Sequence, residues 1–353
     1  MKRSVVVALS GILVAASAGL GNAQTTVKVA WCAKTVSSAA APFAIATKMG
    51  WYKDAGIKVE LVPMPGSTDC VKSVATKDVQ YGLPSIEPLA IIRPQGVKVK
   101  NYYTAYQGNI YGIAVPVDSP VKAFTDLKGK KIGVTSMASA GVIVARALAK
   151  ENGFNPDKDV TIVVAGEAAQ TAALLRSNQV EALSQFDTQY ALTENAGAKL
   201  RMLDTKDIAR FPSNGLIALE ERLANNRAEA VALAQGYAKG TAFAIANPEA
   251  AIRILWEVYP FTKATGKDEA TAMRDDLATL NARIVNWKRE AGGVTKWGEN
   301  SVENYTAYID FLVKNGVLKE KAATADLITN DLIEDINKFD QGEIEKMAKG
   351  WKG

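Results

Sequence analysis

Short apolar strands alternate with amphipathic helices in the first two-thirds of this chain, and the pattern occurs twice. Residues 27–31 alternate apolar and polar side chains as a strand does, and residues 43–49 follow with the spacing of a helix. Repeated strand–helix–strand units predict mainly parallel sheets with helices packed against them. On this basis, strands are expected at residues 27–31, 57–61, 79–83, 131–134, 161–164 and 183–186.

The two rounds of this pattern are separated by a break at about residues 111–120. After the second round the chain is strand-like at 214–219 and then mostly helical to its end. We therefore predict two α/β lobes, with residues 24–110 and 212–353 in lobe one and residues 111–211 in lobe two. Two crossings between the lobes imply a hinge and a cleft, and open α/β sheets bind ligands beyond the carboxyl ends of their strands.

Residues 1–23 have the three parts of a secretory signal peptide. Lys2 and Arg3 precede an apolar stretch that ends near Leu20, and small residues lead to an expected cleavage near Ala23. The apolar stretch is short for a permanent membrane span, although an uncleaved anchor is the alternative. We expect a secreted, soluble, periplasmic protein.

The composition excludes several classes of function. The chain contains no histidine, the commonest general base and metal ligand, and only two cysteines, so we expect no metal site and no cofactor. Without Lys2 and Arg3 the chain has 40 basic and 37 acidic residues, which are dispersed along it. Because the basic residues are dispersed, we expect no nucleic-acid partner. We also expect a monomer.

Three segments of the chain resemble the periplasmic solute-binding proteins of ABC importers for nitrate, sulfonates, taurine and thiamine precursors. Residues 41–60 are similar to the family's opening, with a Pro-aromatic helix start, Gly50-Trp51-Tyr52 and a Gly-Ile-x-Val-Glu ending. Residues 126–134 and 174–182 resemble the start of its second lobe and a helix-to-strand return. The resemblance runs from about residue 27 to 214. It implies the two-lobe type II fold with two hinge crossings, a ligand in the cleft, a helical C-terminal third and a membrane permease as partner.

Small and hydroxyl residues at predicted helix starts are the first group of candidate ligand contacts. Small residues let a ligand approach the backbone, and helix N-termini favour anionic groups. The alternative is that the serines only cap their helices. The candidates are Ser37, Ser38, Gly66, Ser67, Ser85, Ser136, Ala138, Ser139, Ala140 and Gly141.

Aromatic, acidic and amide residues near strand ends form the second group. Aromatic rings could stack on a planar ligand, although packing in the core is the alternative. Carboxylates in the cleft would favour a ligand with an amino or N–H group, although they could only offset helix dipoles. The candidates are Trp31, Tyr106, Phe186, Glu87, Glu167, Asp187 and Asn214, with Gln170 and Gln185 weaker and Lys34 more typical of a solvated surface.

Cys32 follows the first strand and Cys70 lies at the start of the helix after the second. Neighbouring parallel strands bring these two positions to the same edge of a sheet, so we predict a disulfide in an oxidising compartment. The alternative is two separate buried thiols. The bond would add about 3–4 kcal/mol of stability in the chain-entropy model.

These features together predict a binding protein that captures a small polar organic ligand by hinge closure. We expect a sulfonate-like or taurine-like molecule or a related organic acid. A pyrimidine or aromatic heterocycle, or a role as a ligand-sensing receptor partner, is the alternative. Thiamine-pyrimidine synthases share the fold implied by the resemblance, but their histidine and cysteine-rich motif are missing here. We therefore expect no enzymatic activity.

Overall fold

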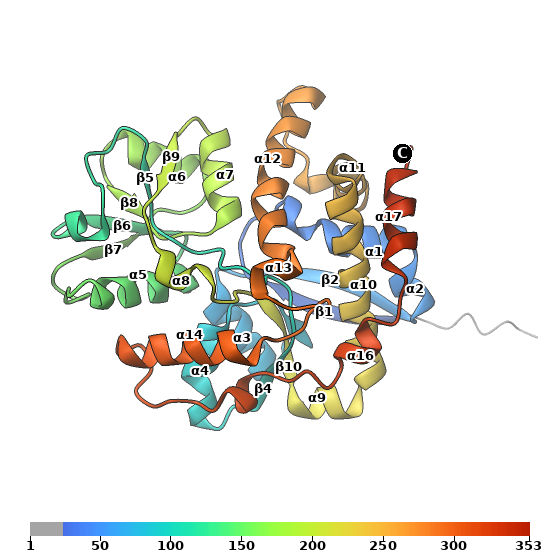
Figure 1. Cartoon of the computed structure of the whole chain (residues 1–353). Helices are drawn as coiled ribbons and strands as arrows, with labels where there is room; N and C mark the ends of the chain where they lie inside the picture. Colours follow the sequence, from blue (N-terminus) through green and yellow to red (C-terminus); the bar gives the residue numbers. More distant parts are fainter. Residues whose placement is uncertain (1–23) are drawn as a thin grey trace, which may run out of the picture.

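Two five-stranded sheets organise the chain, one in each lobe (Figure 1). The computed structural model describes residues 24–353, so the predicted signal peptide lies outside the described residues. The lobe-one sheet has the order β2-β1-β3-β10-β4, and the lobe-two sheet has the order β7-β6-β8-β5-β9. The two-lobe type II fold is therefore confirmed. The predicted lobe boundaries, after residues 110 and 211, stay a prediction.

Each sheet is mixed, with one strand that runs against the other four. In lobe one β1 is parallel to β2 and β3, whereas β10 is antiparallel to β3 and β4. In lobe two β6 is parallel to β7 and β8, whereas β5 is antiparallel to β8 and β9. β5 and β10 are the first strands after each crossing. The strands are β1 (Thr25–Trp31), β2 (Ile57–Pro63), β3 (Tyr81–Gly82), β4 (Val99–Thr104), β5 (Ala114–Pro116), β6 (Lys131–Val134), β7 (Thr161–Val164), β8 (Ala182–Leu183), β9 (Leu200–Met202) and β10 (Gly215–Leu219).

The strand predicted at 183–186 is wrong at its C-terminal end. β8 stops at Leu183, because the backbone N–H of Gln185 donates to the Tyr190 hydroxyl instead of a strand partner. Phe186 then precedes a helix, α7, that begins at Asp187. The end of this short strand therefore leads directly into a helix N-terminus, at the edge of the sheet that faces the other lobe.

Helices cover both sheets, and the C-terminal third is helical as predicted. The first two-thirds contain α1 (Ala41–Lys48), α2 (Trp51–Asp54), α3 (Ser67–Ala75), α4 (Ile86–Ile92), α5 (Ala140–Glu151), α6 (Ala168–Arg176), α7 (Asp187–Asn195) and α8 (Lys206–Ala209). The rest contains α9 (Glu220–Asn225), α10 (Arg227–Ala246), α11 (Pro248–Val258), α12 (Glu269–Trp287), α13 (Arg289–Gly292), α14 (Val302–Lys314), α15 (Thr324–Leu327), α16 (Ile333–Ile336) and α17 (Gln341–Lys349). Short 3-10 turns occupy Ser38–Ala40, Arg93–Gln95, Phe124–Leu127 and Pro260–Thr262.

Two glycines in α10 let this long helix pack closely against α1 and α2. A Cβ at Gly240 would lie 2.2 Å from the carbonyl oxygen of Pro42, and one at Gly236 would lie 2.2 Å from the Tyr52 ring. Both contacts are far shorter than van der Waals distance, so only glycine fits. The C-terminal helices are thereby fixed to the N-terminal part of lobe one.

One C-terminal helix also reaches the other lobe. α12 packs against α7 of lobe two and against the 3-10 turn at Ser38–Ala40 of lobe one. Figure 1 shows α12 standing between the two lobes, beside α7. The helical third therefore helps to form the space between the sheets.

The predicted disulfide between Cys32 and Cys70 is confirmed, with the two Cα atoms 5.9 Å apart. It ties the end of β1 to the first turns of α3. Its loop spans 38 residues, for which the chain-entropy model gives about 4 kcal/mol of stabilisation.

Candidate ligand-binding site

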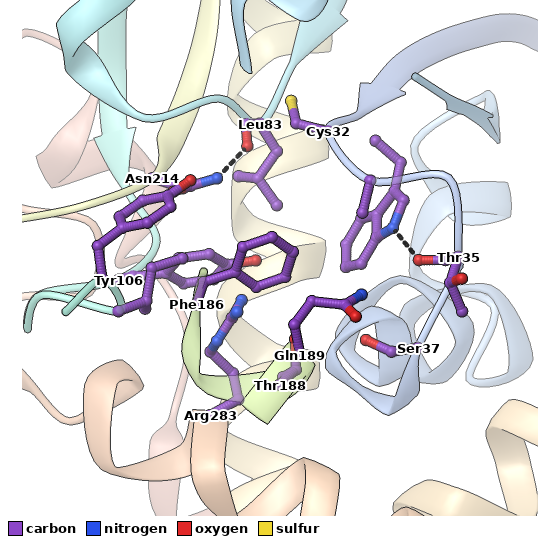
Figure 2. Close-up of a pocket in the computed structure, with 14 residues that line it drawn as sticks. Cys32, Thr35, Ser37, Leu83, Tyr106, Phe186, Thr188, Gln189, Asn214 and Arg283 are labelled. Carbon is purple, nitrogen blue, oxygen red and sulfur yellow. Dashed lines mark hydrogen bonds between the residues drawn. The ribbon is translucent and has the colours of Figure 1, made fainter. Parts of the chain in front are cut away.

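A pocket lies between the two lobes, at the carboxyl ends of the strands (Figure 2). Lobe one contributes the loop after β1, the two crossings contribute residues near 106–111 and 214, and lobe two contributes the start of α7. Its lining residues are Trp31, Cys32, Ala33, Thr35, Ser37, Leu83, Tyr106, Ile110, Tyr111, Phe186, Thr188, Gln189, Asn214 and Arg283. The loop after β1 and the start of α7 are two of the strand-end regions that the sequence pointed to.

Four aromatic side chains form the walls of this pocket. The indole Nε1 of Trp31 donates to the Thr35 carbonyl at 2.9 Å, which fixes the ring. Tyr111 and Phe186 meet edge to face, with ring centroids 6.0 Å apart. The Tyr106 ring lies against the guanidinium group of Arg283. Such walls suit a planar or apolar ligand surface.

Polar groups at the pocket are partly used by the protein itself. The Asn214 amide donates to the Leu83 carbonyl at 2.7 Å, which joins the return crossing to the end of β3 (Figure 2). The Gln189 Oε1 accepts from the backbone of Ala168 at 3.4 Å. Among residues 24–353, the Gln189 Nε2 and the Ser37 hydroxyl have no hydrogen-bond partner, so both are available to a ligand.

The charged side chain in the lining is Arg283, and it is already paired. Arg283 is 3% exposed; its Nε and Nη2 bind the two carboxylate oxygens of Asp187, at 2.8 and 2.5 Å. Its guanidinium carbon lies 3.9 Å from the centroid of the Tyr106 ring. Burial disfavours the charged guanidinium, but the attraction of Asp187 outweighs this cost and raises the pKa of Arg283. The pair carries no net charge.

The pocket is small in this conformation because the lobes are closed over it. It encloses about 30 Å³, which is room for only a few water-sized groups. An organic ligand therefore requires the lobes to separate or the lining side chains to move.

Direct contacts between the lobes close the pocket on the side of β1 and α3. The Glu167 carboxylate of lobe two accepts from the backbone N–H groups of Lys34 and Thr35, at 3.2 and 3.1 Å, and from the Thr35 hydroxyl. Nearby, the Ser136 hydroxyl donates to the Pro65 carbonyl at 2.8 Å. These bonds join loops that lie about a hundred residues apart in the sequence.

Gly66 lies in the same lobe–lobe contact. A Cβ on Gly66 would lie 2.5 Å from the carbonyl carbon of Ala138, and the backbone N–H of Thr68 donates to the Ala138 carbonyl at 3.1 Å. The absence of a side chain at Gly66 therefore lets the two backbones meet.

The structure brings some predicted site residues to the pocket and places others around it. Trp31, Ser37, Tyr106, Phe186 and Asn214 line the pocket. Gly66, Ser136, Ala138, Ser139 and Glu167 lie at the lobe–lobe contact, where Ser139 also caps α5 through the Gly141 N–H. Asp187 lies behind Arg283. The others are buried outside the lining: Ser38, Ser67, Ser85, Glu87, Ala140 and Gly141.

The weaker candidates also lie outside the lining. Gln185 is buried and donates to the Gly166 carbonyl at 3.0 Å, so its amide is committed within lobe two. Gln170 packs against Gly166 in the same lobe. Lys34 has an exposed side chain, as its alternative interpretation expected.

Glu87 is a buried carboxyl group behind the pocket wall. It is 1% exposed and accepts a hydrogen bond from the Tyr308 hydroxyl of α14. Burial raises its pKa, and the hydrogen bond from Tyr308 offsets part of the rise. Glu87 also adds to the raised pKa of Tyr111, whose largest cause is burial, so the two groups are close.

Sequence reasoning missed Arg283, Gln189, Thr188, Tyr111 and Thr35. One signal for Arg283 was present. Leu280, Ile284 and Trp287 mark the apolar face of α12, and Arg283 falls on that face at helical spacing. A charged residue on a buried face is seldom there without a partner or a function.

The sequence of this fold matches a family model described as NMT1/THI5-like, over residues 37–251. This chain belongs to the NMT1/THI5-like family. The match covers more than half of the chain and confirms the predicted resemblance. The individual relatives and the similar solved structures are distant from this chain in sequence.

Three proteins illustrate the range of similarity. The riboflavin-binding protein RibY of Chloroflexus aurantiacus is 22% identical over 300 residues, which are 83% of this chain and 82% of that protein. A structure from Bordetella bronchiseptica RB50 has a TM-score of 0.69 at 21% identity, covering 89% of this chain and 98% of its own. The periplasmic aliphatic sulphonate binding protein SsuA of Escherichia coli has a TM-score of 0.64 at 16% identity, covering 88% and 99%. At such identities the structural likeness establishes the fold alone.

Proposed function

We propose that this NMT1/THI5-like protein is the periplasmic solute-binding component of an ABC importer. It captures a small organic ligand between its lobes, and a membrane permease recognises the closed form. The signal-peptide pattern of residues 1–23 supports export, and no helix within residues 24–353 has the length and apolar character needed to cross a membrane. A ligand that touches both lobes favours closure by its differential affinity for the closed state.

The ligand that the pocket supports best is a planar heterocycle with hydrogen-bond acceptors. The observation that carries this is the lining itself, with four aromatic walls and a single charge that the protein neutralises. Ring stacking and a few directional hydrogen bonds then supply recognition. The name of RibY, a riboflavin-binding protein, is in keeping with a ligand of this class.

A sulfonate-like or taurine-like ligand is the second candidate. The likeness to SsuA favours it, and so does the Nη1 of Arg283, which has no hydrogen-bond partner among residues 24–353. The charge balance of the pocket is against it, because Asp187 already neutralises the guanidinium. We propose binding and not catalysis in either case, since the lining offers no free carboxylate, thiol or imidazole.

The direct test is calorimetry of ligand-free protein against pyrimidines, flavins and alkanesulfonates. We expect a planar heterocycle to bind and to quench tryptophan fluorescence, because Trp31 lines the pocket. Trp31→Leu should lower the affinity about 5- to 100-fold, the loss expected for one large aromatic contact. Trp51→Leu is the matched control and should bind normally, because Trp51 packs outside the pocket. Failure of every small molecule to bind would overturn the proposal.

A further inference from the structure

The anion-binding edge of Arg283 is occupied by the protein's own carboxylate. Arginine binds carboxylates and sulfonates through two parallel N–H donors. In this pocket the Nε/Nη2 edge is used, because Asp187 accepts one N–H from each of these nitrogens. The two N–H groups of Nη1 and the second N–H of Nη2 make no hydrogen bond to residues 24–353. The guanidinium can thus still donate to a ligand, but Asp187 already neutralises its charge.

Asp187 is held in place by groups other than Arg283. Asn286 of α12 donates to its Oδ2 at 3.0 Å, and the backbone N–H of Thr188 donates to its Oδ1 at 2.7 Å. An incoming anion would have to replace a carboxylate that several donors fix in the bound geometry. Arg283 lies on α12 and Asp187 begins α7, so the pair joins two helices whose residues are 96 positions apart.

We propose that Asp187 is a specificity-determining residue, which occupies one anion-binding edge of Arg283 and neutralises its charge, so that the closed pocket accepts an uncharged acceptor group and rejects sulfonates and carboxylates. The inference rests on the proposed function of the same pocket. It extends that function by assigning exclusion of one ligand class to one side chain.

The physical basis is the difference in desolvation between neutral and anionic ligands. An anion that enters a closed, aromatic-lined space loses its hydration and needs an unpaired cation in return. Beside Asp187 it meets repulsion as well. A carbonyl or ring nitrogen loses far less hydration, and a hydrogen bond from an N–H group of Nη1 satisfies it. The Asp187 carboxylate therefore discriminates against anionic ligands by electrostatic repulsion within the site.

The first arm of the test uses the wild-type protein and a matched pair of ring ligands, nicotinamide and nicotinate. The two share one ring and differ in the charge of the substituent. We expect nicotinamide to bind at least about 10-fold more tightly, the scale of one charge-dependent hydrogen bond. Nicotinate binding as tightly as nicotinamide, or more tightly, overturns the proposal.

The second arm asks whether removal of the carboxylate admits an anion. Asp187→Asn keeps the shape of the side chain and frees the positive charge of Arg283. We expect ethanesulfonate to bind this variant about 10- to 100-fold more tightly than the wild type, as seen by calorimetry. Asp310→Asn is the matched control, because Asp310 forms a half-exposed surface ion pair with Lys321 and its removal changes the net charge equally. A folded Asp187→Asn protein with no gain, or an equal gain in the control, overturns the proposal.

The two arms separate this inference from the proposed function. Wild-type protein that binds no planar ring at all refutes the proposed ligand class, while the ethanesulfonate comparison still decides the role of Asp187. If Asp187→Asn does not fold, thermal unfolding of the wild type with ethanesulfonate gives the answer. No rise in melting temperature supports exclusion of anions, and a rise at millimolar ethanesulfonate overturns it.

Discussion

Trp31, Tyr106 and Phe186 reach the pocket from three separate stretches of chain, and contacts with neighbouring lining residues hold each ring. Trp31 is bound to the Thr35 carbonyl, Tyr106 lies against Arg283, and Phe186 packs against Tyr111. Side chains that are already ordered lose little conformational entropy when a ligand arrives. At the scale of single residues, the aromatic walls are therefore pre-organised once the lobes have closed.

The buried carboxyl of Glu87 leads to a pH dependence of stability. Burial raises its pKa above the ordinary 4.5, so above that pH the folded protein holds a proton that the unfolded chain releases. The contribution of Glu87 is therefore fully present below pH 4.5 and is lost as the pH rises through the folded-state pKa. We expect Glu87→Gln to flatten the decline of the unfolding free energy with pH, as measured by urea denaturation.

The matched control for this prediction is Glu303→Gln, because the Glu303 side chain is exposed. Its pH profile of stability should match that of the wild type. A Glu87→Gln profile that also parallels the wild type would show that Glu87 keeps its ordinary pKa in the folded protein.

Some site residues could be predicted from the sequence because strand ends define where a cleft lies. Trp31, Phe186 and Asn214 all stand at such ends, and all three line the pocket. Arg283 could not be placed in the same way, since only the packing of α12 against α7 brings it there. The acidic candidates show the same limit. Asp187 was among the candidates, but its partner Arg283 could not be identified because it lies 96 positions away in the sequence.

At the scale of elements, the sequence predicted the strands on one side of each sheet, β2 and β1 or β7 and β6, better than those on the other side. β1, β2, β6 and β7 lie where period-two patterns were read. β4 was missed because consecutive residues are buried on both of its faces, which hides the alternation. β5 and β9 were missed because each has only three residues.

The start of α3 and the loop before α5 meet when the lobes close, and Gly66 makes that contact possible. In Gly66→Ala the new Cβ would lie 2.5 Å from the Ala138 backbone, so the lobes must stay farther apart. Overpacking of this kind costs about 1–3 kcal/mol. We expect ligand affinity to fall roughly 5- to 150-fold, by calorimetry, while the melting temperature of the ligand-free protein changes little.

Gly350→Ala provides a control, because its Cβ would meet the nearest atom at an ordinary 3.4 Å. This variant should bind the ligand normally. Unchanged affinity in Gly66→Ala would mean that the two loops do not have to touch in the ligand-bound state.

At the scale of the whole molecule, two chain crossings and the packing of α12 on α7 join the lobes, in addition to the loop contacts of Glu167, Ser136 and Gly66. The crossings lead directly into β5 and β10, the antiparallel strands of the two sheets. α12 adds the Arg283–Asp187 pair at the centre of the interface. Domain closure and ligand specificity thus depend on the same contact.

The position of β10 between β3 and β4 also determines the order in which the chain can fold. Val99 of β4 pairs with Leu219 of β10, so the lobe-one sheet stays divided until the whole of lobe two has been passed. Closing so long a loop is slow for a flexible chain. We expect lobe two to fold first and to shorten this loop, because pairing Ala114 with Met202 brings its two ends together.

All six tryptophans lie outside residues 114–202, so their fluorescence reports lobe one and, through Trp31 and Trp287, its contact with lobe two. After dilution from urea with the disulfide intact, we expect far-UV circular dichroism to recover part of its signal before tryptophan fluorescence changes. A single rate shared by both signals would show that the lobes fold together. Lobe two would then not fold before lobe one, and completion of the divided lobe-one sheet would limit the folding rate of the entire chain.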